Sequence, residues 1–286
     1  MASISPFTLL FDDATDDGPG LSEAVREIYG SDWRLPRFEG RPYVYVNFVL
    51  SRDGRVSFNE PGHMAGVEVS GFDAWDRWLM GLLRARADAI LMGDKTLEVE
   101  PDHIWTAEFL CPEDAELFAS VRKGERRRPM PLQVFLSLDG DVDPAASIFS
   151  VPEAHVVLAT GAHGASRARE LPPTAARLDV RELGKNAVDV RALLEVLYGE
   201  YGVETVLCEG GPRAYASLVA AGCVDDEFLA LSPVVVGSRA DRPRPGLIEG
   251  ACFSPRSSPR SRPLSLRRAG DLLFLRSRYS FPHLTT

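Results

Sequence analysis

A short apolar run that ends in two glycines is the feature that most constrains the fold of this chain. Residues 206–208 are apolar, Glu209, Gly210, Gly211 and Pro212 follow, and residues 213–219 have the composition of a helix. This order predicts a buried strand, a tight turn and a helix. Glycines let the backbone approach a ligand closely, and a helix start presents unpaired N–H groups with a partial positive charge. The segment therefore suits a phosphate, although a plain strand-to-helix connection has the same signature.

Strand-like and helix-like segments alternate along most of the chain. Residues 43–50 are mostly apolar on both faces, which is typical of a central strand covered on two sides. Residues 73–87 predict a helix with Asp73 as its cap. One face of that helix carries an apolar stripe formed by Trp75, Trp78, Leu79, Leu82 and Leu83. Further strands are predicted at 89–92, 132–136, 154–159, 204–208 and 227–236, and further helices at 190–198 and 213–221. The alternation favours an α/β fold with a largely parallel sheet.

The two ends of the chain differ from this pattern. Residues 263–268 and 272–279 flank a short turn at Gly270, which predicts a C-terminal antiparallel hairpin and therefore a mixed sheet. Residues 1–40 are acidic and rich in turn residues, with one short helix predicted at 21–29 and capped by Ser22. We interpret residues 1–40 as an N-terminal extension and residues 41–286 as the folded domain.

Composition excludes several classes of function. The chain of 286 residues has 41 acidic and 32 basic residues and a formal net charge of −9. This charge argues against general nucleic-acid binding, which needs a basic surface, but permits a small anionic ligand. No apolar run approaches about 18 residues, so no membrane span is expected. Four unclustered cysteines fit a cytoplasmic protein, and the histidine spacing predicts no metal site.

The common nucleotide and hydrolase motifs are absent from the sequence, among them G-x-G-x-x-G, the P-loop, the nucleophile elbow and the zinc deaminase signature. Four polar or glycine turns instead follow predicted strands. These turns are Ser51-x-Asp53-Gly54, Gly93-x-x-Thr96, the turn at Ser137, and residues 209–212. Ligands gather at the carboxyl ends of strands in α/β sheets, so the turns are expected to converge on one cleft. Each also has a structural alternative, because Asp-Gly is a common turn pair and Thr96 can cap a local turn.

The order and spacing of these fragments resemble the reductase domain of bacterial riboflavin biosynthesis, which has the fold of dihydrofolate reductase. The matching segments are residues 41–44, 51–55, 82–93 with Thr96, 209–212, 221–226 and 231–237. The resemblance covers roughly residues 41–281. It implies a mixed, mostly parallel sheet flanked by helices, NADPH as the cofactor, and a homodimer. The implied reaction converts the ribosyl group of 5-amino-6-(5-phosphoribosylamino)uracil to ribityl.

The resemblance also implies roles for particular residues. Arg84 and Glu209 would bind the substrate, with Arg84 pairing with its phosphate through a bidentate fork. Glu209, Asp53 and Asn47 would be the catalytic residues. The residues that would contact the cofactor are Val49, Ser70, Gly93, Thr96, Glu100, Ser137, Gly210, Gly211, Pro212, Arg213, Ala214 and Tyr215. Arg167 and Arg169 are further candidates for a 2′-phosphate contact, with a solvated surface role as their alternative.

Several departures from the family pattern leave alternatives open. Asn47 stands where the family often has a lysine, and Glu100 stands where it tends to have aspartate. Residues 101–112 lack the basic character expected of a substrate-binding segment. The deaminase domain that often accompanies this reductase is absent, and residues 1–40 are too short to form one. A reductase of the same fold for another pyrimidine- or pteridine-like compound, and a non-catalytic NADPH-binding homodimer, are the two alternatives.

Overall fold

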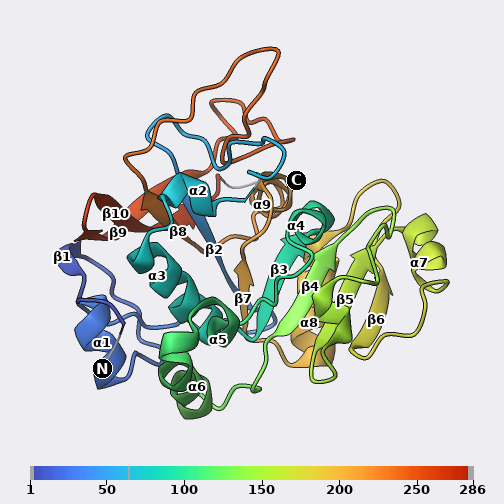
Figure 1. Cartoon of the computed structure of the whole chain (residues 1–286), viewed down its shortest axis with the longest axis horizontal. Coiled ribbons are helices and arrows are strands. Elements are labelled where there is room, and N and C mark those ends of the chain that lie inside the picture. The colour runs from blue at the N-terminus through green and yellow to red at the C-terminus, as the bar shows by residue number, and fades with distance from the viewer. Residues whose placement is uncertain (1–2, 64, 283–286) are drawn as a thin grey trace.

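A ten-stranded sheet organises the molecule (Figure 1). The computed structural model describes residues 3–63 and 65–282, so the outermost ends of the two predicted regions lie outside the described residues. The sheet has the strand order β1-β9-β10-β8-β2-β7-β3-β4-β5-β6. Its strands are β1 (Thr8–Asp12), β2 (Tyr43–Leu50), β3 (Ala89–Gly93), β4 (Leu132–Leu136), β5 (His155–Thr160), β6 (Arg177–Glu182), β7 (Thr205–Cys208), β8 (Asp226–Leu231), β9 (Arg260–Ala269) and β10 (Leu272–Ser280).

The sheet is mixed, with its parallel part uninterrupted. Every neighbouring pair from β8 through β2, β7, β3, β4 and β5 to β6 is parallel. The pairs β8–β10, β10–β9 and β9–β1 are antiparallel. The predicted fold class is therefore confirmed, including the C-terminal hairpin, which turns at Gly270 with a positive φ of 54°.

Helices cover both faces of the sheet. They are α1 (Glu23–Tyr29), α2 (Val67–Ser70), α3 (Ala74–Ala85), α4 (Asp94–Val99), α5 (Ala107–Leu110), α6 (Ala115–Gly124), α7 (Ala162–Ala168), α8 (Val190–Tyr201) and α9 (Pro212–Ala220), with 3-10 turns at Pro112–Asp114 and Ser147–Ser150. Successive side chains of a strand point to opposite faces, and β2 shows the consequence. Tyr43 and Tyr45 lie in the core under α1, α3 and α6, whereas Val44 and Val46 lie in the core under α8 and α9.

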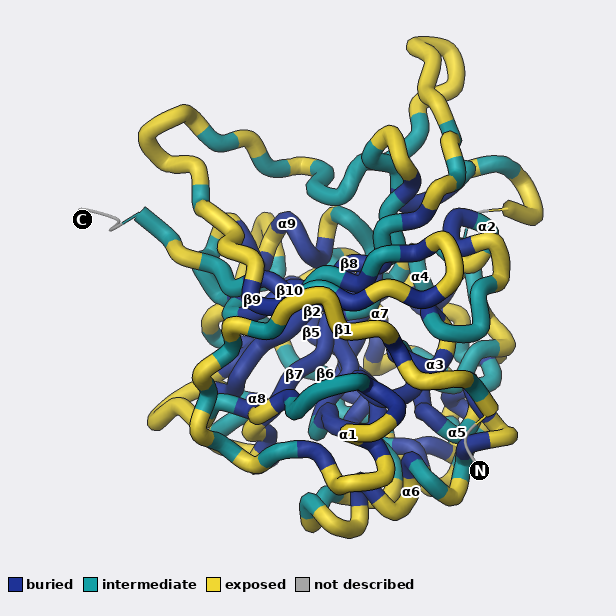
Figure 2. Tube along the Cα trace, turned by 90° about the vertical axis from the view of Figure 1, so that its left-hand side faces the viewer, coloured by how far each residue is buried: buried dark blue, intermediate teal, exposed yellow. Residues whose placement is uncertain are grey.

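Residues 3–40 join this architecture at the edge of the sheet. Strand β1 pairs with β9 at the edge of the sheet (Figure 2), and Trp33 is completely buried in the main core. Asp16 forms ion pairs with Arg276 and Arg278 of β10. The acidic turns of this segment look solvated in the sequence because their partners lie more than 200 residues away. The boundary at residue 40 itself stays a prediction.

Two further differences have local causes. The strand predicted at 227–236 ends at Leu231, because Pro233 follows shortly and cannot donate to the ladder. Strand β6 was missed because its residues are mostly polar and only half buried. It nevertheless extends the parallel sheet beside β5, where polar side chains are tolerated at an edge strand.

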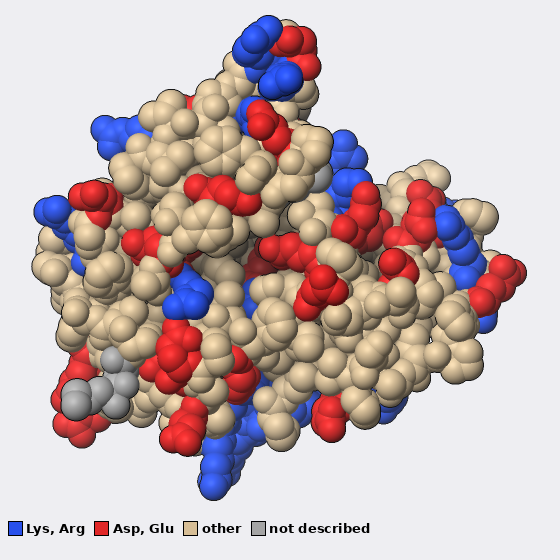
Figure 3. Space-filling model, in the orientation of Figure 1, with Lys and Arg blue, Asp and Glu red and all other residues tan. Residues whose placement is uncertain are grey.

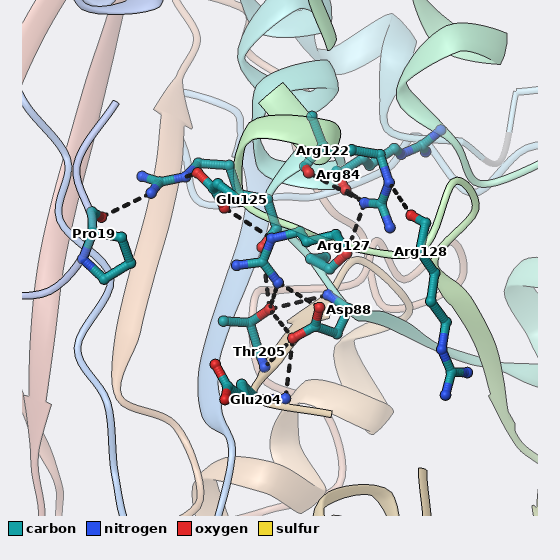
Figure 4. Close-up of polar contacts among 12 residues, drawn as sticks. Pro19, Arg84, Asp88, Arg122, Glu125, Arg127, Arg128, Glu204 and Thr205 are labelled. Atoms are coloured by element: carbon teal, nitrogen blue, oxygen red, sulfur yellow. Dashed lines mark hydrogen bonds and ion pairs between the residues drawn. The ribbon is translucent and has the colours of Figure 1, made fainter. Parts of the chain in front are cut away.

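A network of charges ties together the amino ends of β3 and β7 (Figure 4). The carboxylate of Asp88 pairs with Arg127 at 2.5 Å and accepts hydrogen bonds from the backbone N–H and hydroxyl of Thr205. Glu125 pairs with Arg127 at 2.8 Å and with Arg86 at 2.6 Å. We call these five residues the basal network. Every carboxylate in it has an arginine partner.

Candidate active site

The register of β2 and β7 places Asn47 and Glu209, two of the predicted site residues, side by side. They lie at the carboxyl ends of these strands, opposite the basal network. Strands β2 and β7 are parallel, with Val46 opposite Cys208, so Asn47 and Glu209 are the next residues on neighbouring strands. Because successive side chains of a strand point to opposite faces, Asn47 and Glu209 both point toward the face of the sheet that α3 covers. Asn47 is buried, which fits its position beneath that helix.

Glu209 is held by Arg84, a residue near the end of α3. Arg84 Nε lies 3.0 and 2.9 Å from the two carboxylate oxygens, and Arg84 Nη2 lies 2.8 Å from Oε2. The two side chains are only 2% and 5% exposed. A bidentate pair of this kind fixes the carboxylate in one orientation.

The rest of the Arg84 guanidinium is bound by a segment whose role the sequence did not reveal. Arg84 Nη1 lies 2.9 Å from Nε2 of His103 and 3.2 Å from the carbonyl oxygen of Thr106. The His103 ring packs against Trp105 and Phe109, with centroid distances of 5.0 and 4.8 Å. Because arginine only donates, Nε2 must be the accepting nitrogen of a neutral ring.

These contacts change the expectation for Arg84 and for residues 101–112. Burial, and next the charge of Arg84, lower the pKa of His103 to about 3, so the ring stays neutral at ordinary pH. In this arrangement Arg84 is bound to Glu209, His103 and Thr106 and is not free to form a bidentate fork with a phosphate. Its position after an apolar helical stripe gave no signal of these partners. The only sequence signal for His103 is its place shortly after the Gly93-x-x-Thr96 turn.

Two more carboxyl groups lie near Glu209. Burial raises the pKa of Asp76 to about 7, the nearby Ser70 opposes this, and the charges of Asp73 and Glu209 add to it. The Ser70 hydroxyl itself donates to the carbonyl oxygen of Val67 at 2.9 Å. Burial also raises the pKa of Glu100, with Arg84 opposing and Glu209 adding to the shift. Figure 3 shows acidic side chains along a hollow near the middle of the molecule. The sequence analysis named Glu100 but missed Asp76, which is only 6% exposed, because it lies within the first turn of α3.

The glycine turn after β7 has the geometry of a phosphate-binding turn. A Cβ atom on Gly210 would lie 2.8 Å from the Cα of Met92, so only glycine fits there. Gly211 has a φ of +58°, and α9 begins at Pro212 without a side-chain cap. The first N–H groups of such a helix are available to an anion.

The second glycine turn, at the end of β3, comes to the same place. The nearest atom to a Cβ on Gly211 would be Thr96 Oγ1 at 3.8 Å, and a Cβ on Gly93 would lie 4.0 Å from the Cβ of Ala214. The structure therefore brings Gly93 and Thr96 beside the start of α9. These are residues that a pyrophosphate could contact, and their geometry fits the implied cofactor.

Val49 and Ser70 lie near the end of β2. A Cβ on Gly66 would lie 3.2 Å from a methyl of Val49, which places the loop before α2 against the end of β2. Ser70, in α2, is buried beside Asp76. Both residues are thus near the carboxyl end of β2, where the nicotinamide contact was expected.

Three of the predicted residues are engaged elsewhere in the structure. Asp53 is exposed, and its carboxylate accepts hydrogen bonds from the backbone N–H groups of Val236 and Gly237, which lower its pKa. The hydroxyl of Ser137 accepts from the N–H of Asp141 within its own turn. The Tyr215 ring stacks on Phe48 in the opposite core, 5.2 Å between centroids. Asp53 thus fastens a loop, and Tyr215 offers the turn only its backbone.

The remaining candidates are placed at the surface. Arg213 is exposed in the first turn of α9. Arg167 pairs with Asp141 at 2.7 Å, with both side chains about half exposed or more. An exposed arginine that is already paired is a weak candidate for a phosphate contact.

Comparison with known proteins decides the family. The family model described as the RibD C-terminal domain matches residues 42–259. The chain belongs to the RibD C-terminal domain family. Membership in a family of reductases implies a nicotinamide cofactor, and the resemblance stated from the sequence is confirmed.

Two archaeal relatives carry the same name, 2,5-diamino-6-ribosylamino-4(3H)-pyrimidinone 5′-phosphate reductase. The protein of Archaeoglobus fulgidus is 28% identical over 74% of this chain and 89% of its own length. The protein of Methanothermobacter thermautotrophicus is 28% identical over 71% of this chain and 82% of its own.

Solved structures share the fold. A pyrimidine reductase-like protein of Corynebacterium diphtheriae has a TM-score of 0.62 at 21% identity, over 84% of this chain and 92% of that one. A diaminohydroxyphosphoribosylaminopyrimidine deaminase/5-amino-6-(5-phosphoribosylamino)uracil reductase of Thermotoga maritima has a TM-score of 0.58 at 17% identity, over 84% of this chain and 57% of that one. Within residues 3–63 and 65–282, no helix is long and apolar enough to cross a membrane.

Proposed function

We propose that this protein is an NADPH-dependent reductase of riboflavin biosynthesis that reduces the ribosyl group of a 6-ribosylaminopyrimidine 5′-phosphate to ribityl. The observation that carries the proposal is the meeting of two features at the end of β7. The glycine turn at Gly211, whose geometry suits a phosphate, and the buried Arg84–Glu209 pair are joined there by Gly210 alone. Such a site can hold a cofactor and a substrate in contact with each other.

The turn residues would bind the cofactor. The backbone of residues 210–214 would hold its pyrophosphate, with Thr96 beside it and Val49 toward the nicotinamide. The cofactor, when bound, supplies the hydride. The protein itself must orient the two ligands, exclude water and deliver one proton, so a nucleophile is not required.

Glu209 would orient the pyrimidine by accepting hydrogen bonds from its N–H groups. Arg84 acts through Glu209, because its guanidinium is bound to that carboxylate and to the His103 segment. Asn47, next to Glu209 in the register, would add a neutral amide contact. The substrate phosphate would need cations other than Arg84.

A reductase of another pyrimidine- or pteridine-like compound is the second candidate. It is favoured by the same contacts of Arg84, because a ligand without a phosphate needs no further cation. The homodimer, the cytoplasmic location and the absence of a nucleic-acid partner stay predictions from the sequence.

The function is tested by following NADPH oxidation with the two named pyrimidines as substrates, each supplied alone. We expect turnover of about 1 per second or more with at least one of them. NADPH binding without turnover of either pyrimidine would contradict the proposed substrate and favour the second candidate. NADH in place of NADPH tests the choice of cofactor.

The cofactor site is tested by Gly211→Val. A branched side chain at a φ of +58° is strained and would fill the approach to the turn, so NADPH affinity should fall at least about tenfold. Gly202→Val is the matched control, because Gly202 has a φ of +67° at the end of α8, with open space around it. Equal NADPH affinity in the two variants would contradict the assignment of the turn.

A further inference from the structure

Helix α9, whose first turn would hold the cofactor, is fastened to the sheet by a buried side chain. The backbone N–H of Tyr215 donates to the carbonyl oxygen of Gly211 at 3.1 Å, which closes the first turn of the helix. Tyr215 is completely buried, and its ring stacks on Phe48 of β2. One residue therefore connects the glycine turn to the strand that carries Asn47 and Val49.

The hydroxyl of Tyr215 lies in a polar cluster with side chains from three strands. It donates to Oε1 of Glu227 in β8 and lies 2.7 Å from the hydroxyl of Tyr279 in β10. Because a phenol has a single proton, Tyr279 is the donor between the two rings, and its oxygen also lies 3.3 Å from Oε1 of Glu227. The hydroxyl of Ser261 in β9 donates to Oε2 of Glu227 at 3.2 Å. We call these four residues the α9 anchor.

Glu227 is a buried acid whose carboxyl group is bonded, in the described part of the chain, to hydroxyl groups. It is 4% exposed, and its partners are Tyr215, Tyr279 and Ser261. Burial raises the pKa of Glu227, and the hydrogen bonds from the three hydroxyls oppose the shift. An apolar side chain would fill this space without the cost of desolvation. What the acid adds is direction, because a hydrogen bond fixes the Tyr215 hydroxyl at one point of the sheet.

The α9 anchor lies level with the start of the glycine turn. Val46 of β2 is opposite Cys208 on one side and opposite Glu227 on the other, and Cys208 is the last residue of β7 before the turn. On the side of β3, the turn is held by the close approach of Gly210 to Met92. The α9 anchor holds it on the side of β2 and β8, where consecutive glycines would otherwise leave the backbone free to move.

We propose that Tyr215 is a positioning residue for the cofactor, which acts by holding the first turn of α9 against β8 through Glu227. This inference rests on the proposed function, since it concerns the same cofactor-binding turn. A turn binds an anion well when its N–H groups are already in place. Where the ligand has to order the turn, that cost is subtracted from the free energy of binding. Tyr215 therefore contributes to cofactor affinity although its side chain lies in the opposite core.

The test is Tyr215→Phe, which keeps the ring on Phe48 and removes the hydroxyl. We expect the Kd for NADPH, measured by titration calorimetry, to rise at least about fivefold, because the turn is no longer held in place. The kcat at saturating NADPH should stay within about twofold of the wild type, because the bound complex keeps its contacts. In the protein without cofactor, the amides of residues 210–215 should exchange with solvent faster than in the wild type.

Two further variants separate this hydrogen bond from a general loss of packing. Glu227→Gln keeps an acceptor for Tyr215 and presents its amide N–H to Ser261, so its NADPH affinity should stay within about twofold of the wild type. Tyr201→Phe is the matched control, because the hydroxyl of Tyr201 in α8 donates to the carboxylate of Asp179 at 3.0 Å. Removal of this hydroxyl should leave NADPH affinity unchanged.

An NADPH affinity in Tyr215→Phe within about twofold of the wild type overturns the proposal. An equal loss of affinity in Tyr201→Phe or in Glu227→Gln also overturns it, since the effect would not depend on the hydrogen bond that fastens the turn. Gly211→Val distinguishes these results from a failure of the proposed function. If Gly211→Val also leaves NADPH affinity unchanged, the turn itself is wrongly assigned, whereas a loss in Gly211→Val alone overturns only the role of Tyr215.

Discussion

The two ends of the sheet treat buried charge in opposite ways. In the basal network, Asp88 and Glu125 each have an arginine, and the side chain of Arg127 is only 8% exposed. At the other end, Arg84 pairs with Glu209, and among the described residues neither the buried Asp76 nor the partly buried Glu100 forms an ion pair. The same helix, α3, lies between them, since Arg84 and Arg86 are separated by one residue.

This difference distinguishes buried charges that stabilise the fold through ion pairs from buried charges whose partner would be a ligand. A buried pair costs desolvation but satisfies both partners. A buried carboxyl group without a cation lowers stability, and such groups concentrate at functional sites. The imbalance at the carboxyl end is therefore evidence for a ligand site that does not depend on the family relationship.

Breaking the basal network should give the largest change in stability. Asp88→Asn removes the charge opposite Arg127 while keeping an acceptor for Thr205. We expect it to lower the free energy of unfolding by about 3 kcal/mol, because the buried Arg127 and Arg86 guanidiniums are left to share one carboxylate, that of Glu125. Urea denaturation measures the change. Turnover per folded molecule should be unaffected, because Asp88 lies at the far end of the strands.

Asp241→Asn is the control for this prediction. Asp241 pairs with Arg239 at 2.9 Å, but both side chains are more than 60% exposed, and such pairs contribute little. If Asp88→Asn and Asp241→Asn lowered stability equally, the buried ion pairs of the basal network would contribute no more to stability than an exposed pair. The contrast between the two ends of the sheet would then fail.

The sequence was sufficient for the parts of the fold that depend on local pattern. Strands β2 and β4 have the predicted bounds, because their apolar residues are consecutive and flanked by turn residues. Helix α3 follows from its apolar stripe and its Asp73 cap, which the structure shows accepting from the N–H groups of Trp75 and Asp76.

The parts that depend on distant partners could not be predicted. Arg84 reads as a solvated or phosphate-binding residue until the fold places His103 and Glu209 around it. Asp16 reads as a loop acid until β10 supplies two arginines. The turns at Gly93 and Gly211 were predictable as separate features, but Tyr215 was assigned to the cofactor although its side chain lies in the opposite core.

Neutralising Asp76 should raise stability, in contrast to Asp88. The folded-state pKa of Asp76 is about 7 and its ordinary value is 3.8, so the folded protein holds this proton more tightly. Stability from this group is complete below about pH 4 and is lost as the pH rises through 7. Asp76→Asn should therefore be more stable than the wild type by roughly 2 kcal/mol at pH 8. The gain should vanish near pH 4.

Thermal unfolding at pH 4 and pH 8 measures this prediction, and Glu116→Gln, at an exposed acid in the first turn of α6, serves as the control. A loss of stability in Asp76→Asn at pH 8 would mean that the carboxylate is matched by partners within the fold. Asp76 would then resemble Asp88, and the contrast between the two ends of the sheet would no longer hold for it.

His103→Gln should have the smallest effect, and a pH dependence opposite in sign to that of Asp76. The pKa of His103 is about 3 in the folded protein, against an ordinary value of 6.5. Between these values the unfolded chain binds the proton and the folded protein does not, so wild-type stability falls as the pH drops from 6.5 toward 3. Glutamine keeps an acceptor for Arg84 but does not titrate. The variant should be about 1 kcal/mol less sensitive to a change from pH 7 to pH 5.

Urea denaturation at the two pH values measures this difference, and His163→Gln, at an exposed position, controls for the loss of a histidine. His103→Gln also tests whether His103 acts on the site only by holding Arg84 in position. If the ring only supplies an acceptor to Arg84, His103→Gln should keep kcat within a few-fold of the wild type, whereas His103→Leu should lower it by at least about tenfold, because Arg84 loses a buried partner. Equal losses of kcat in His103→Gln and His103→Leu would show that the imidazole does more than accept a hydrogen bond from Arg84. His103 would then have to be counted among the groups that act on the ligand at this end of the sheet.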